Sequence, residues 1–301
     1  MELSASRVKP LLAVVAWAIM LGVSDLPDIV LKSGTGEVPP WLAWSKVAFL
    51  AVAVGVCLAW RAVRSLRPFA LVLLVFLLAL RASSWIQGTP RWRSVFGGEH
   101  VSFGLGYLGL FIPDFGVAAA VLATLWLLKR RPSEFFLAVG RLDARIRPIR
   151  WLGIGEGKSW REFGWIFAAA AGLGVMIPTL LSMHFAPGAL ARAAPLLPAC
   201  FAFAAINAFN EEVYFRVSLL STLDGVIGTR HALLINVVFF GLAHWLYGSP
   251  PGLVGFAMTG FLAFLMGKSI LETKGLAWAW FIHFVPDVVI FASYAILWMQ
   301  R

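Results

Sequence analysis

The fold is decided by long apolar stretches, of which the clearest is PGLVGFAMTGFLAFLMGKSILETKGLAWAWFIHFVPDVVIFASYAILWM, residues 251–299. It holds two apolar runs of about 20 residues, the length of a helix that crosses the hydrocarbon core of a bilayer. Similar runs occur earlier in the chain, at about 10–31, 41–60, 68–86, 103–128, 164–186, 194–224 and 231–248. The sequence therefore predicts an all-α fold, a polytopic bundle of about eight or nine transmembrane helices.

The composition excludes an ordinary soluble domain. Of the 301 residues, 60% are hydrophobic and 13% are charged, about half the charged share of an average soluble protein. The net charge of +10 comes from basic residues between the apolar runs, where they orient a membrane protein. No nucleic-acid-binding motif accompanies them. We expect the lipid bilayer, and no nucleic acid, to be a partner of this chain.

The longest polar segment divides the chain into three parts. Residues 129–163 contain nine lysines and arginines, and the positive-inside rule assigns such a segment to the cytoplasm. Within it, residues 141–163 mix Trp, Leu and Ile with Arg, which predicts an interfacial helix. The expected parts are a four-span region of unknown role (1–128), this cytoplasmic basic linker (129–163) and a membrane core (164–301). Four predicted spans precede this segment, so the N-terminus is expected on the same, cytoplasmic side. We expect a multi-pass protein of the inner or plasma membrane.

Ionisable residues lie inside the last predicted spans. A charged side chain at the centre of a membrane helix costs about 2.5–3.5 kcal/mol on insertion scales, so such residues indicate a functional site. The set comprises Glu211, Glu212, Arg216, His244, His283 and Asp287.

Helix geometry predicts that these residues can meet. Glu211 and His244 each lie 13 residues from the ends of the short loop near 224–231, which gives both a depth of about 20 Å at 1.5 Å per residue. His283 and Asp287 share one helix face at i, i+4 spacing.

The two adjacent glutamates are expected to point in different directions. Glu212 and Arg216 stand at i, i+4 and predict an ion pair. Glu211 is rotated by about 100° from Glu212 around the helix, so it is free to face a cavity.

Three motifs in this order resemble those of the CAAX-protease and bacteriocin-processing (CPBP) family of intramembrane endopeptidases. The motifs are Glu211-Glu212-x-x-x-Arg216, Phe240-x-x-x-His244 and His283-x-x-x-Asp287. The resemblance extends over about 150–299. Two positions depart from the family pattern: Val217 stands where glycine is usual, and Asp287 stands where many members have asparagine.

The resemblance implies an endopeptidase in which Glu211 and His244 hold and deprotonate a water molecule. His283 and Asp287 would then polarise the scissile carbonyl and stabilise the oxyanion. The implied supporting residues are Glu212, Arg216 and Phe240. The implied substrate is a membrane-anchored or lipidated peptide or protein, cut near its membrane-embedded or C-terminal end.

The sequence is compatible with two mechanisms, one without a cofactor and one with zinc. The favoured mechanism needs no cofactor, and we expect no metal. The alternative is a zinc site formed by Glu211, His244 and His283, one carboxylate and two histidines with an open coordination position. The zincin motif His-Glu-x-x-His does not occur in the chain.

Two other classes of function use the same residue types. A proton- or solute-coupled transporter also carries intramembrane Glu, His and Asp, but the chain has no inverted repeat of the kind that builds many transporters. A non-catalytic membrane scaffold or immunity protein would keep these residues for structure alone. Serine catalysis lacks a Gly-x-Ser-x-Gly motif.

Overall fold

The computed structural model describes residues 10–98, 101–183, 185–248 and 250–300. All regular secondary structure in these ranges is helical, apart from two isolated β-bridges, so the predicted all-α fold is confirmed. Residues 1–9, for which the sequence predicts a cytoplasmic location, lie outside the described residues.

Among the described helices, seven segments are long and apolar enough to cross a membrane, or eight if a bent pair is counted as one span. The bent pair is α1 (Pro10–Val23) with α2 (Leu26–Thr35), and the angle between them is 47°. The other segments contain α3 (Trp41–Ala59), α4 (Arg67–Gly88), α6 (Phe103–Leu127), α7 (Trp160–Ser182), α9 (Leu197–Glu211) with its continuation α10 (Ser218–Ile227), α12 (Gly252–Thr273) and α13 (Ala277–Trp298). The chain is an integral, multi-pass membrane protein.

The remaining predicted span, α11 (Thr229–Tyr247), is a helix of 19 residues, which is long enough to cross a membrane but is not among the helices that are also apolar enough. Polar residues including Arg230 and Asn236 lower its hydropathy. It packs along α12 and against α1.

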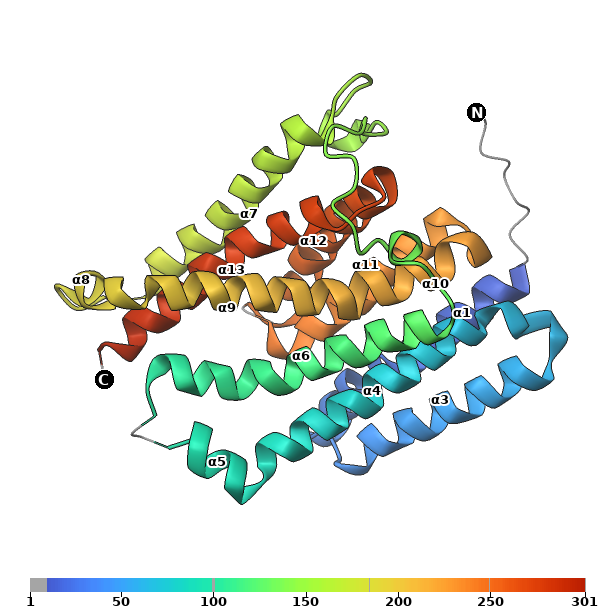
Figure 1. Ribbon diagram of the computed structural model, residues 1–301, viewed down its shortest axis with the longest axis horizontal. Coiled ribbons are helices and arrows are strands. Elements are labelled where there is room, and N and C mark those ends of the chain that lie inside the picture. Colours follow the sequence, from blue (N-terminus) through green and yellow to red (C-terminus); the bar gives the residue numbers. More distant parts are fainter. Residues whose placement is uncertain (1–9, 99–100, 184, 249, 301) are drawn as a thin grey trace.

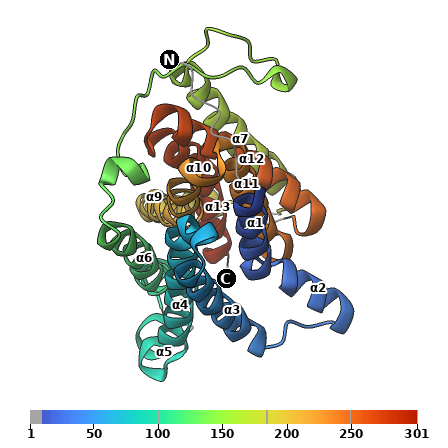
Figure 2. The ribbon, with the colours of Figure 1, turned by 90° about the vertical axis from the view of Figure 1, so that its right-hand side faces the viewer.

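The helices form two groups with α9 between them (Figure 1). On one side, α4 packs between α3 and α6, and α6 packs against α9. On the other side, α13 packs against α7, α9 and α12. Figure 2 shows the bundle from its end, with α2 projecting from it, and α2 has no buried residue.

A proline inside α6 leaves one backbone carbonyl without its usual helical partner. Pro113 lies inside this helix and has no N–H with which to bond the carbonyl of Gly109. The indole N–H of Trp92, on the short helix α5 (Pro90–Phe96), donates to that carbonyl at 3.0 Å. The freed backbone group is therefore satisfied inside the protein, as a membrane environment requires.

The basic linker is not the interfacial helix that its composition predicts. It contains the short 3-10 turns η2 (Pro132–Phe135) and η3 (Arg150–Leu152) and the two isolated bridges. Gly153 and Gly157 adopt positive φ angles of 72° and 84°, a conformation that interrupts a right-handed helix. The helix prediction failed because it used the apolar and basic composition and ignored these glycines.

The linker instead holds the turn between α12 and α13. Arg141 N–H donates to the carbonyl of Thr273 at 2.8 Å, and Leu276 N–H donates to Ala138 at 2.8 Å. The indole of Trp278 donates to the carbonyl of Leu142 at 2.9 Å. These bonds fix the start of α13.

Candidate active site

A π-helical turn, η5 (Glu212–Val217), joins α9 to α10. π-helical turns are rare and occur frequently at functional sites. Glu211, the last residue of α9, has a side chain that is 25% exposed, whereas the side chain of Glu212 is fully buried. The two glutamates therefore diverge as the helix geometry predicts, and Glu211 is the one that reaches open space.

Glu212 connects two helices. Its Oε1 lies 3.2 Å from Nη1 of Arg216 and 2.8 Å from Nδ1 of His283 on α13. The guanidinium of Arg216 lies 3.8 Å from the centre of the Phe240 ring. The predicted ion pair between Glu212 and Arg216 forms, and the bond to His283 adds a contact that spacing along one helix could not reveal.

The imidazole of His283 lies among three carboxylates. A carboxylate of Glu212 accepts but does not donate, so Nδ1 of His283 carries a hydrogen. The opposite nitrogen, Nε2, lies 3.6 Å from Oε2 of Glu211 and 3.8 Å from Oδ2 of Asp287. Both separations exceed a direct hydrogen bond, which leaves Nε2 available to a third group such as water or substrate.

Asn207 is a site residue to which the sequence analysis assigned no role. Its Nδ2 donates to Oε1 of Glu211 at 3.2 Å and to Oδ2 of Asp287 at 3.0 Å. Asn207 stands one turn before Glu211, and this i, i+4 spacing is a signal that could have identified it. The amide therefore links the carboxylates of α9 and α13.

His244 occupies a different position from the other candidates. Its Nδ1 lies 2.9 Å from the carbonyl of Phe240 in its own helix, and its ring centroid is 4.4 Å from that of Phe240. The Phe240 ring is also 6.1 Å from the imidazole of His283. Among the described residues, no hydrogen bond or ion pair joins His244 to Glu211. If both act on one water molecule, that water must lie between the two side chains.

A zinc site would require three donor side chains that point at one position. In the part of the chain that the structure describes, no group of three or more His, Cys, Asp or Glu residues is arranged to hold a metal ion. Nδ1 of His244 lies 2.9 Å from the carbonyl oxygen of Phe240, so only its Nε2 would be open to a metal ion. Glu211, His244 and His283 do not form such a group in the described residues.

The fold and the site define an integral membrane protein with a cluster of interacting carboxylates, an imidazole and a guanidinium between its helices. Residues 193–289, about a third of the chain, match the family model described as Rce1-like, type II CAAX prenyl endopeptidase Rce1-like. This match confirms the resemblance predicted from the three motifs, and the matched segment contains all of them. No curated protein and no solved structure matches the chain. The family implies a CAAX-type intramembrane endopeptidase.

Proposed function

We propose that this protein hydrolyses a peptide bond near the membrane-embedded or C-terminal end of a membrane-anchored or lipidated peptide or protein, with Glu211 as the general base. The observation that carries the proposal is the position of the partly exposed Glu211 carboxylate beside Nε2 of His283 and Nδ2 of Asn207. Peptide hydrolysis needs a base for water and a donor for the oxyanion. This cluster offers both on two neighbouring helices, α9 and α13.

Glu211 takes a proton from water as the water oxygen attacks the carbonyl carbon. The bond from Asn207 orients Oε1 of Glu211, which leaves Oε2 to face the water. The same carboxyl group then returns the proton to the leaving amine. One fragment gains a carboxylate, and the other gains an amine.

His283 acts on the carbonyl oxygen. Glu212 accepts the hydrogen of Nδ1 at 2.8 Å and holds the ring in place. When the ring is the doubly protonated imidazolium, Nε2 also carries a hydrogen and donates it to the developing oxyanion. Asp287 lies 3.8 Å from Nε2 and orients the ring. In its protonated form Asp287 is itself a donor.

His244 is proposed to contact the water or the substrate through Nε2, because its Nδ1 is engaged by the carbonyl of Phe240. Phe240 separates this histidine from Arg216 and His283 through its ring contacts. The proposed catalytic residues are Glu211, His244, His283 and Asp287, with Asn207 and Glu212 as positioning residues.

The test uses the full chain in detergent and a membrane-anchored fluorogenic peptide library. We expect Glu211→Gln, which keeps the shape and removes the base, to lower cleavage by about 10²–10⁴-fold. Glu37→Gln changes an exposed loop glutamate and is the matched control. Cleavage by Glu211→Gln at the wild-type rate would overturn the assignment of the base.

The same cleavage assay with a metal chelator distinguishes the mechanism without metal from the zinc-dependent one. The proposed mechanism expects cleavage to persist in the chelator. Loss in the chelator with recovery on added zinc would contradict it. Solute flux that Glu211→Gln abolishes, with no peptide cut by the wild type, would favour the transporter class.

A further inference from the structure

A pocket with four charged side chains, Asp25, Asp28, Lys46 and Arg81, lies beside the candidate active site and is built largely by the N-terminal helices. It has a volume of about 350 Å³, at the small end of ligand sites. Its wall on the side of the core includes Phe215 and Ala243, the neighbours in sequence of Arg216 and His244. The family match begins at residue 193, so the charged residues of this pocket lie outside it.

One wall of the pocket carries a net negative charge. Lys46 of α3 is buried and contacts the carboxylate of Asp28, while its Nζ lies 3.7 Å from Oδ1 of Asp25. Two carboxylates therefore share one ammonium group. The Asp25 side chain is 30% exposed, and it lies at the 47° break between α1 and α2, which places the surplus charge at the cavity surface.

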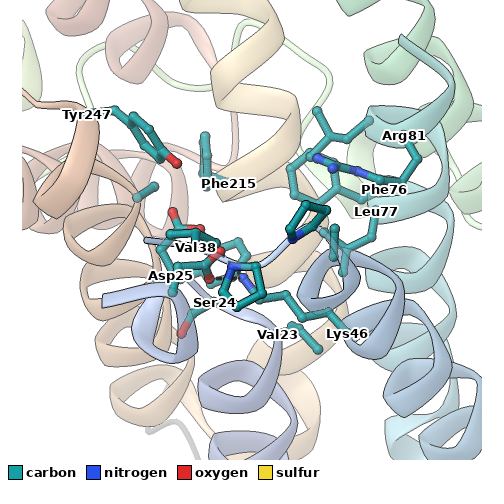
Figure 3. Close-up of a pocket in the computed structure, with 17 residues that line it drawn as sticks. Val23, Ser24, Asp25, Val38, Lys46, Phe76, Leu77, Arg81, Phe215 and Tyr247 are labelled. Atoms are coloured by element: carbon teal, nitrogen blue, oxygen red, sulfur yellow. Dashed lines mark hydrogen bonds and ion pairs between the residues drawn. The ribbon is translucent and has the colours of Figure 1, made fainter. Parts of the chain in front are cut away.

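The opposite wall carries a positive charge. Arg81 lies on α4 after thirteen consecutive residues without charge, 68–80, inside a segment apolar enough to span the membrane. Among the described residues it makes no ion pair or hydrogen bond, although it lines the pocket and is half-buried. Figure 3 shows Asp25 and Arg81 on opposite sides of the pocket.

An intramembrane arginine without a carboxylate partner indicates a function, because its insertion is costly. The pocket offers a cation from Arg81 and a surplus anion from Asp25 and Asp28. A ligand that satisfies both walls carries an anion and a cation of its own. The volume restricts it to a small molecule.

We propose that this pocket binds a short zwitterionic peptide, with its carboxylate on Arg81 and its ammonium group on Asp25. The link to catalysis rests on the proposed function: hydrolysis of a bond close to a C-terminus releases a short fragment that has a new ammonium group and keeps the original carboxylate. Phe215 separates the pocket from the candidate active site, because its ring also packs against Phe240 at 5.0 Å. The pocket is thus positioned to hold that fragment.

The experiment measures binding of Ala-Ala-Ala to the purified full chain by titration calorimetry, and compares it with the N-acetylated and the C-amidated peptides. Each blocked peptide is expected to bind at least about tenfold more weakly, since each lacks one charge-assisted hydrogen bond. This comparison uses the wild-type protein, so it does not depend on the folding of any variant. Equal binding of either blocked peptide, or no binding of the free peptide at millimolar concentration, would overturn the proposal.

Two variants locate the site. Arg81→Gln and Asp25→Asn are each expected to weaken binding of the free peptide by about tenfold or more. Arg64→Gln, at an exposed arginine outside the pocket, is expected to bind as the wild type does. Binding unchanged in Arg81→Gln would contradict the assignment.

The same titration on Glu211→Gln separates this inference from the proposed catalysis. We expect that variant to lose cleavage and to keep peptide binding. Binding with no cleavage by the wild type would overturn the proposed function alone. Cleavage without binding of the free peptide would overturn the pocket assignment alone.

Discussion

Replacement of Glu212 by glutamine tests whether the buried polar cluster is held together by charge. Glu212 and Arg216 are both fully buried, 3.2 Å apart. Glutamine keeps an acceptor for Nδ1 of His283 but leaves the guanidinium without its partner anion. Breaking a buried pair by removing one partner costs about 3–5 kcal/mol. We therefore expect the free energy of unfolding of Glu212→Gln to fall by about that amount.

Replacement of Arg216 together with Glu212 is expected to recover part of the lost stability. Arg216→Met removes the cation and leaves the buried Glu212 charge, so it is also expected to destabilise the protein. The double variant Glu212→Gln/Arg216→Met removes both charges and is expected to be more stable than either single variant, because a buried ion pair replaced by uncharged groups of similar volume is often neutral.

Equilibrium unfolding of the wild type and the three variants in detergent supplies the four corners of a double-mutant cycle. Leu181→Met, at a residue that is 81% exposed, is the matched control for the introduced methionine. Additive effects of the two single changes, or a loss below about 1 kcal/mol in Glu212→Gln, would refute the reasoning, since an unpaired buried charge costs more than that.

Three further predictions concern other contacts. Gly140→Ala places a Cβ 2.7 Å from the backbone of the α12–α13 turn at a φ of +78°, so we expect its free energy of unfolding to fall by about 1–3 kcal/mol. Gly55→Ala, whose Cβ meets nothing within 4 Å, is the control and is not expected to be destabilised. Asn207→Leu removes both amide bonds to the site carboxylates, and kcat is expected to fall by about tenfold or more with unfolding as the control measurement; an unchanged kcat would argue against its positioning role. Lys46→Met leaves two partly buried carboxylates unpaired and is expected to lower the unfolding temperature, whereas Lys32→Met at an exposed position should not.

The sequence by itself determined the fold class and the approximate position of each membrane-spanning helix. A bilayer has no water to satisfy backbone groups, so apolar runs of span length must be helical and can be read along the chain. The same local rule applies to pairs on one helix, and the Glu212–Arg216 ion pair follows from i, i+4 spacing alone. The linker at 129–163 shows the limit of reading composition, because its glycines decided against a helix.

The tertiary structure decided which residues meet across helices. The bond between Glu212 and His283, the bridge from Asn207 to Asp287 and the separate position of His244 all depend on how the helices are rotated and crossed. The pocket between Asp25 and Arg81 joins residues from different helices in the same way. Spacing along a chain fixes the face of one helix, but packing of side chains between helices sets the rotation of each against its neighbours, and that packing is a property of the whole bundle.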